Sequence, residues 1–382
     1  MTYELELTGL DGSNPLGFLA ALGTLAELSA DPSTIYRMSW VTASGVWRPR
    51  LHTEQPLEAS AVASRLAELL RLGTAAGKDA EQLQEKLEAA DKVQMHAKKA
   101  LKETLDDIKK RKLRGEERQR AIDDEAQPLV TDYGLKRADW LKLLELASPS
   151  PELALGKDPG ATPEHFRFTA ERIAGRLSLA DRRCGDLLAA FGSEAVFDIK
   201  NNRVRTTPFC FVTGSGHQYF FATVVELLSN VTVARIEQAL FHPVPHADAK
   251  LSMRWDPVED RRYAMMWSDP TSTGNEAKTN WALNLLAYRG LQLLPSVPLA
   301  RGVATTGFLK RDNGPEWTWP IWSAPVGIDP LRSLLALSEL QKEQPNRAVL
   351  AACQVAEVFR SARLQVGNPP LHKLNFSPSH TA

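Results

Sequence analysis

The side chains best suited to chemistry in this chain are arginines and lysines that lie among amides and aromatic rings. The segment KNNRVR (residues 200–205) has this character, and strand alternation would place Arg203 and Arg205 on one face. Such cationic groups contact phosphates, while nearby rings stack on bases or sugars. They equally suit internal Arg–Asp clamps that fix a loop. Both interpretations stay open from the sequence alone.

The same combination recurs further along the chain. RWDP (residues 254–257) and DRRY (residues 260–263) place guanidinium groups beside aromatic rings and carboxylates, and another basic group lies near Gly307. Together with a basic helical segment, these positions make up the predicted nucleic-acid-binding residues. They are Lys109, Lys110, Arg111, Lys112, Arg114, Lys200, Asn202, Arg203, Arg205, Arg254, Arg261, Arg262, Lys310 and Arg311.

Two further clusters contain groups that react or bind metals in other proteins. In GSGH (residues 214–217), Ser215 lies close to His217, but a nucleophile and its base usually come from separate parts of the chain and need a third group. HPVPHAD (residues 242–248) holds three potential metal ligands, yet its prolines exclude a helix that would aim both histidines at one point. The sequence has no phosphate-binding loop and no dinucleotide fingerprint. It therefore predicts no catalytic centre, no metal site and no cofactor.

A long charged segment is the most distinctive of the elements that must position these side chains. From residue 78 to about residue 127 the chain is rich in Ala, Glu, Lys, Leu and Gln. This composition predicts exposed helix, hairpin-like, which bends near Gly115 and is ended by Pro128. Between Lys92 and Arg120, eleven Lys or Arg accompany five acidic residues. Such charge forms either a solvated helix with i,i+4 ion pairs or a basic arm that lies on a phosphate backbone.

The pattern around this segment is that of a mixed fold. Period-2 alternation and strand-forming residues predict strands at residues 3–8, 38–42 and 46–52. Asn14 followed by Pro15 predicts the start of an apolar helix, and residues 347–362 predict a final helix. The predicted fold class is α+β, a mixed core with a long charged helical (hairpin-like) insertion. The predicted parts are an N-terminal α+β part (1–75), the charged helical insertion (76–128), a C-terminal α+β part (129–368) and a disordered tail (369–382).

The composition is ordinary for a soluble protein, and the chain has no net charge. Its 46 basic and 46 acidic residues cancel, so an affinity for nucleic acid must come from a local patch. The three cysteines are far apart without C-x-x-C spacing, which favours a reducing cytoplasm over a disulfide framework or zinc site. The sequence contains no signal peptide and no apolar run near the roughly 18 residues of a membrane span. We expect a cytoplasmic protein with no membrane contact.

Two stretches of the chain resemble a known family. GLDGSNPLGFLAALG (residues 9–23) resembles the N-terminal signature of CRISPR-associated proteins from type I-G (formerly I-U) systems. These proteins include a helicase–nuclease-extension family and large-subunit-like members. RWDP, DRRY, NLLAYRG (residues 284–290) and TTGF (residues 305–308) are similar to their C-terminal part. The matching stretches cover a minor part of the chain and exclude the charged segment.

The resemblance implies a non-catalytic subunit of a CRISPR RNA-guided effector complex, for surveillance or interference, in antiviral defence. The implied partners are CRISPR RNA and/or target DNA, and other CRISPR-associated subunits including the helicase–nuclease. The alternative left open is a protein–protein interaction module of a defence complex, in which the charged helices dock a partner and no nucleic acid is contacted. A hydrolase that uses Ser215 and His217 is a third and less favoured hypothesis.

Overall fold

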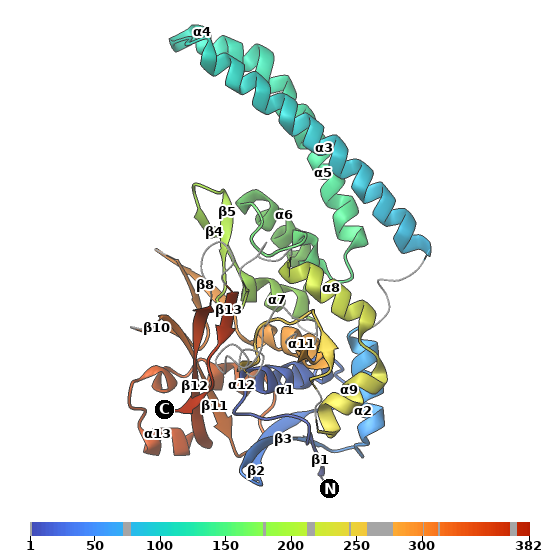
Figure 1. The fold of residues 1–382 in the computed structure, drawn as a ribbon, viewed down its shortest axis with the longest axis vertical. Coiled ribbons are helices and arrows are strands. Elements are labelled where there is room, and N and C mark those ends of the chain that lie inside the picture. Colours follow the sequence, from blue (N-terminus) through green and yellow to red (C-terminus); the bar gives the residue numbers. More distant parts are fainter. Residues whose placement is uncertain are drawn as a thin grey trace, which may run out of the picture. The chain divides into compact units, whose positions relative to one another are not determined.

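The computed structural model describes residues 2–71, 78–178, 181–211, 218–243, 246–257, 278–300, 302–311, 314–366 and 373–382. The chain divides into two compact units, one of residues 1–73 with 155–382 and the other of residues 74–154. Helices and strands build the first unit and helices build the second, so the α+β class is confirmed (Figure 1). The helical part extends to residue 154 instead of 128, and the two predicted α+β parts contribute to a single unit.

A three-stranded antiparallel sheet opens the first unit. Its order is β1 (Tyr3–Glu6), β3 (Val46–Thr53) and β2 (Arg37–Ala43). The three strands predicted from sequence are therefore confirmed. The sheet also receives a single β-bridge between Met38 and Val326, which joins it to a distant segment.

Helix α1 (Pro15–Leu28) and helix α11 (Trp281–Gly290) cross at glycines. Every residue of α1 is buried. A Cβ atom at Gly23 would lie 1.7 Å from the carbonyl oxygen of Leu286, and one at Gly290 would meet the α1 backbone at 2.3 Å. Only glycine allows the two backbones to approach this closely.

The segment around residues 254–257 also meets residues 9–23 and 284–290 through polar contacts. Asn14 caps α1 as predicted, because its Oδ1 accepts the N–H of Leu16 at 2.8 Å. Its Nδ2 donates to Asp256 Oδ1 at 2.9 Å. On α11, Asn284 Oδ1 accepts the N–H of Met253 at 2.9 Å. The N-terminal and C-terminal stretches therefore share one core.

A second antiparallel sheet packs against α1 through aromatic side chains. Its strand order is β10-β11-β12-β13, and β14 also pairs with β12. The ring of Phe18 on α1 lies 5.7 Å from Trp317 and 5.8 Å from Trp319. The strands are β10 (Phe308–Arg311), β11 (Gly314–Trp322), β12 (Val355–Val366), β13 (Lys373–Phe376) and β14 (His380–Thr381).

Two predictions near the C-terminus are wrong. The helix expected over residues 347–362 ends as α13 (Arg347–Ala352). Gln354 then adopts a φ of 59°, and the β-branched and aromatic residues that follow pair in β12. The tail expected to be disordered (369–382) forms β13 and β14 from residue 373 onward, because strand β12 offers it a partner.

Short helices and hairpins complete the first unit. The helices are α2 (Ala59–Leu69), α6 (Pro163–Ala174), α7 (Arg183–Phe191), α8 (Phe220–Asn230), α9 (Val233–Phe241) and α12 (Ile328–Leu335). In this unit 3-10 turns occupy Leu291–Leu293 and Ser338–Gln341, and a further one, Pro151–Leu155, spans the boundary between the units. The hairpins pair β4 (Gly192–Asp198) with β5 (Arg203–Thr206), β6 (Asp248–Ala249) with β7 (Lys278–Thr279), and β8 (Ser296–Leu299) with β9 (Gly302–Thr305).

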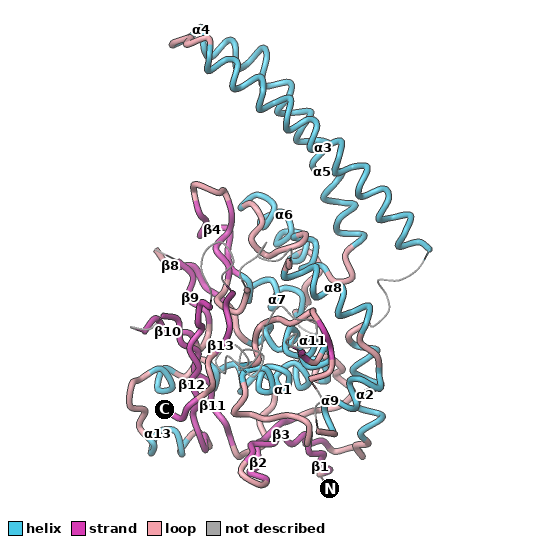
Figure 2. Tube along the Cα trace, viewed as in Figure 1, coloured by secondary structure: helices cyan, strands magenta, loops and turns pink. Residues whose placement is uncertain are grey.

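Two long helices build the second unit. Helices α3 (Lys78–Lys110) and α5 (Gln127–Ala147) lie side by side (Figure 2). They are joined by α4 (Gly115–Ala121) and a π-helical turn (Ile122–Ala126), so the bend expected near residue 115 is confirmed. Pro128 does not end the helical segment. It occupies the first turn of α5, where its missing N–H has no helical partner in any case.

Candidate nucleic-acid interface

One carboxylate shapes the turn of the β4–β5 hairpin. Asp198 Oδ1 accepts the backbone N–H of Lys200 at 2.9 Å, and Oδ2 accepts the side-chain amide of Asn201 at 2.8 Å. These two bonds, that from Lys200 first, hold the pKa of Asp198 below its usual value. Asn202 adopts a φ of 50°, a conformation that Asn tolerates better than most residues. The turn is thus fixed by hydrogen bonds, and the charge of Arg205 lowers the pKa of Asp198 further.

Three predicted cations of this hairpin remain exposed. Lys200, Arg203 and Arg205 all lie at the surface, whereas Val204 between the two arginines is buried. This alternation places both guanidinium groups on one face, as the sequence predicts. Within the described part of the chain, none of the three side chains forms an ion pair or a hydrogen bond. They are therefore available to an anionic ligand.

The end of the helical unit is closed by an arginine and a small apolar cluster. Arg111 Nε donates to Asp107 at 2.8 Å, and its Nη1 donates to Glu125 at 2.7 Å. Ile108 and Ala121 are buried beside this contact. Arg111 ties α3 to the π-helical turn, so this predicted ligand contact instead holds the tip together.

The four other predicted cations at this tip are exposed. Between residues 109 and 120, seven Lys or Arg accompany two Glu. Solvated ion pairs do occur, for example between Lys99 and Glu103 at 3.8 Å. Among the residues that the structure describes, however, no ion pair involves the exposed predicted group, which is Lys109, Lys110, Lys112 and Arg114. The unit therefore combines solvated pairs along its helices with a cationic tip.

The basic candidate on β10 is split between two roles. Lys310 is exposed and makes no ion pair with any residue described here. Arg311 pairs with Glu316 at 3.3 Å and donates to the carbonyl of Gln341 at 2.9 Å. Arg311 is thus an internal clamp, and Lys310 is the surface cation.

The predicted cations of the two aromatic loops do not add to this surface. Arg254 is buried and adopts a φ of 62° beside the buried Trp255. Its contact with nucleic acid stays a prediction. Arg261 and Arg262 lie outside the described residues, as do the candidate nucleophile Ser215 and base His217.

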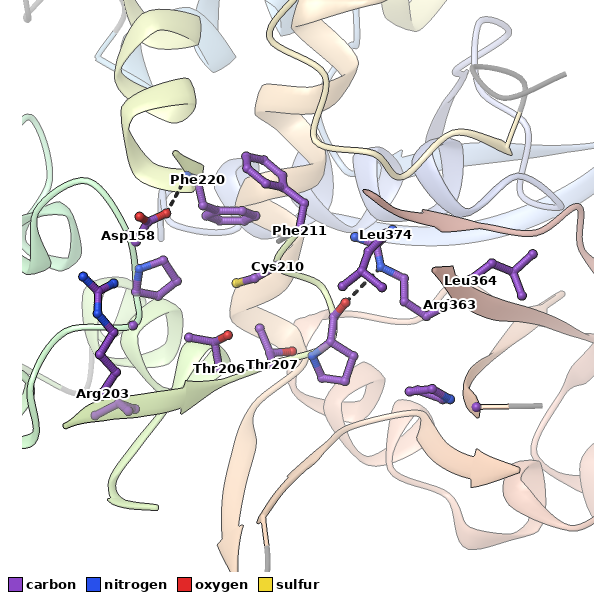
Figure 3. A pocket seen from close by; sticks show the side chains of 16 residues that line it. Asp158, Arg203, Thr206, Thr207, Cys210, Phe211, Phe220, Arg363, Leu364 and Leu374 are labelled. Atoms are coloured by element: carbon purple, nitrogen blue, oxygen red, sulfur yellow. Dashed lines mark hydrogen bonds between the residues drawn. The ribbon is translucent and has the colours of Figure 1, made fainter. Parts of the chain in front are cut away.

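An open cavity of about 850 Å³ lies beside the β4–β5 hairpin (Figure 3). Asp158 and Arg203 stand on one side of it, and Leu364 and Leu374 stand on the other. Pro315 of the β10–β11 hairpin also lines it. Sequence reasoning missed this cavity, because its walls come from four segments that are far apart in the chain and carry no common motif.

A buried arginine that the sequence did not single out supports the cavity wall. Arg363 donates from Nε to the carbonyl of Pro208 at 3.0 Å and from its guanidinium to the carbonyl of Phe209 at 3.3 Å. The guanidinium lies 4.7 Å from the ring centre of Phe376. Arg363 fixes the backbone between β5 and the cavity and is itself buried.

The polar groups of the cavity are suited to binding. Asp158 Oδ1 accepts the N–H of Phe220 at 2.9 Å, at the positive end of α8. Burial raises the pKa of the Cys210 thiol, so the thiol stays protonated at neutral pH and is a poor nucleophile. Thr206 adds a half-buried hydroxyl to the lining. The cavity lining thus combines the exposed Arg203, the buried Arg363, one carboxylate and neutral polar groups with apolar side chains.

The histidine-rich loop does not assemble a metal site in the described chain. His246 Nε2 lies 2.7 Å from Asp256 Oδ2, whereas Asp248 pairs with Arg235 and accepts the N–H of Trp281 at 2.8 Å. The described residues contain no group of three His, Cys, Asp or Glu side chains that could hold a metal ion. The loop's carboxylates serve helix capping and ion pairing.

Two comparisons of the sequence with known proteins found no match. No family model matches the chain, and no curated protein matches it significantly. In the part of the chain that the structure describes, no helix combines the length and the apolar character needed to span a bilayer.

Proposed function

We propose that this chain is a non-catalytic subunit of a CRISPR RNA-guided effector complex of type I-G and contacts guide RNA or target DNA in antiviral defence. The observation that carries the proposal is a set of exposed cations that no described carboxylate pairs with. They are Lys109, Lys110, Lys112, Arg114, Lys200, Arg203, Arg205 and Lys310. On a chain whose 46 basic and 46 acidic residues cancel, such local charge is what attracts a phosphate backbone.

The packing of the resembling stretches supports this proposal. Residues 9–23 cross residues 284–290 at paired glycines, and Asn14 bonds to Asp256. The similarity to the type I-G proteins thus lies in residues that meet in one core, which is where members of one fold would be alike. The proposed partners are CRISPR RNA and/or target DNA, and other CRISPR-associated subunits including the helicase–nuclease.

The proposal is tested on the complex purified from the native host. We expect the chain to co-purify with other CRISPR-associated subunits and with RNA. In the double variant Arg203→Glu and Arg205→Glu, two phosphate contacts are lost. The slope of log affinity against log salt should then fall by roughly 1.4–1.8, because each contact contributes about 0.7–0.9. Affinity should fall equally for unrelated nucleic-acid sequences, since phosphate contacts carry no sequence information.

A matched control reverses two exposed cations elsewhere on the same unit. Arg37→Glu with Lys278→Glu changes the net charge by the same amount at β2 and β7. We expect this control to keep the wild-type salt slope. If the Arg203 and Arg205 double variant also keeps the wild-type affinity and slope, the hairpin does not contact nucleic acid and the proposal is wrong there.

A second candidate, a protein–protein interaction module, is favoured by apolar side chains on the helical unit. Leu135 and Leu146 on α5 are 65% and 70% exposed, and Met95 on α3 is 52% exposed. An interaction module would bury such side chains against a partner subunit. The double variant Leu135→Glu and Leu146→Glu should then lose the other subunits, and the isolated wild-type chain should bind no oligonucleotide. Unchanged co-purification would contradict this candidate.

A further inference from the structure

The cavity beside Arg203 differs from the cationic surfaces because apolar side chains form most of its wall. Leu364 and Leu374 face Asp158 and Arg203 across it (Figure 3). A polyphosphate chain alone would gain nothing from this apolar side. The lining instead fits a ligand with a flat apolar face, polar edges and an adjoining negative charge.

We propose that this cavity takes one unpaired base of a single-stranded nucleic acid, with the adjoining phosphates against Arg203 and Lys310. The inference rests on the proposed function and specifies the form of nucleic acid that the chain binds. Lys310 is the cross-strand partner of Pro315, which lines the cavity. Directly opposed residues share one face of a hairpin, so Lys310 lies on the same side of the β10–β11 hairpin as the cavity.

The size and the lining of the cavity favour an unpaired base over a duplex. Its volume of about 850 Å³ falls in the range of small-ligand pockets, roughly 300–1,000 Å³. Bases inside a duplex are stacked and paired, and only an unstacked base can enter such a pocket and contact apolar walls. The Thr206 hydroxyl then supplies an acceptor for an amino or ring N–H group on the edge of the base.

The backbone beside the cavity argues against an extended peptide as the occupant. A peptide would add to an open strand edge through main-chain hydrogen bonds. The N–H of Val204 on β5 already donates to the carbonyl of Ala161 at 2.9 Å. This edge of β5 is therefore occupied at Val204, and a peptide could not pair with it there.

The test uses the full chain and a short fluorescein-labelled oligonucleotide, either single-stranded or annealed to its complement. Leu364 is exposed at the cavity wall, so Leu364→Glu places a negative charge there without disturbing the core. We expect single-strand affinity to fall roughly tenfold, in line with the loss of one stacked base. Affinity for the duplex should stay within a factor of about two. Pro315→Glu tests a second wall and should give the same pattern.

The control places the same charge on an apolar residue away from the cavity. Ile35→Glu, in the loop before β2, should change neither affinity. If the wild-type chain binds single strand and duplex, and both cavity variants bind as the wild type does, the inference fails and the proposed function stands. If the wild-type chain binds neither form, the proposed function itself fails. Loss of binding to a peptide partner, with oligonucleotide affinity unchanged, would assign the cavity to a peptide.

Discussion

Helices α1 and α11 form one packed pair and helices α3 and α5 form another, and the two pairs differ in what lies between and around them. Helix α1 is buried along its whole length and meets α11 by backbone contact at Gly23. Helix α3 buries little besides Gln94, Ala97 and Ile108, and most of its surface is charged. The α1–α11 pair therefore needs small residues at its crossing and apolar residues around it. The α3–α5 pair can carry many different residues on its exposed surface.

This difference separates what maintains the fold from what meets a ligand. Residues 9–23 and 284–290 lie in the buried pair, and Asp256 contacts it through Asn14. The exposed cations without an ion pair in the described chain lie at the tip of the helical unit, on the β4–β5 hairpin and on β10. The buried pair therefore determines the fold, and the proposed nucleic-acid contact depends on the surface.

The largest effect should follow from adding one methyl group to the buried pair. In Gly23→Ala the new Cβ would lie 1.7 Å from a backbone oxygen of α11 that cannot move away. We expect the free energy of unfolding to fall by more than about 3 kcal/mol, above the usual range for overpacking. Urea unfolding followed by circular dichroism measures this change.

The exposed pair supplies the opposite result for the same substitution. Gly134 lies inside α5, and a Cβ there would meet nothing within 4 Å. Gly134→Ala should stabilise the helical unit by up to about 1 kcal/mol, because Ala restricts the unfolded chain and favours helix. If Gly23→Ala were as harmless as Gly134→Ala, the close crossing of α1 and α11 would be wrong.

The sequence alone predicted the start of α1 but not its contact with α11. Asn14 and Pro15 mark the start of α1, because a cap depends on neighbours within three residues. The reason for Gly23 lies at Leu286, more than 250 positions away, and no local pattern reveals such a contact. The same limit explains the C-terminal errors, since residues 373–382 form strands only where β12 is present.

An effect of intermediate size should distinguish the roles of two adjacent cations, Arg111 and Lys112, at the tip of the helical unit. Arg111 is held by Asp107 and Glu125, whereas Lys112 is exposed and forms no ion pair in the described chain. Arg111→Gln should lower the melting temperature of the helical unit and leave the salt slope of nucleic-acid binding unchanged. Lys112→Gln should lower that slope by roughly 0.7–0.9 and leave the melting temperature unchanged. Equal behaviour of the two variants would remove the distinction between structural and ligand-binding cations.

Of the candidate site, too, the sequence predicted the features that depend on neighbouring residues and missed those that depend on distant contacts. Alternation was enough to place Arg203 and Arg205 on one face, since it depends only on the strand itself. The sequence could not tell which arginines bind carboxylates, because Arg111 and Arg311 find partners through a folded turn and a cross-strand neighbour. The sequence did not predict the cavity either, because segments far apart in the chain form its wall.

The smallest effect should be a pH dependence at the end of the buried pair. Asp181 lies 3.1 Å from Arg183, which reaches the buried Glu27 of α1 at 3.6 Å. The hydrogen bond from Arg183 is the main cause that lowers the pKa of Asp181. Because the folded-state pKa lies below the unfolded-state value of about 4, ionised Asp181 stabilises the fold above that value, and this contribution is lost as the pH falls through the folded-state pKa.

Asp181→Asn should therefore reduce the free energy of unfolding at pH 7 by at most about 1 kcal/mol, since the pair is partly solvated. Against wild type, this difference should shrink toward zero as urea unfolding is repeated at successively lower pH below 4. Asp139→Asn on α5 is the matched control, because its ion pair with Lys142 at 3.4 Å is exposed on both sides. A difference for Asp181→Asn that stays constant with pH would mean that Arg183 is held by Glu27 alone, and that the buried pair has no acid-sensitive contact at this end.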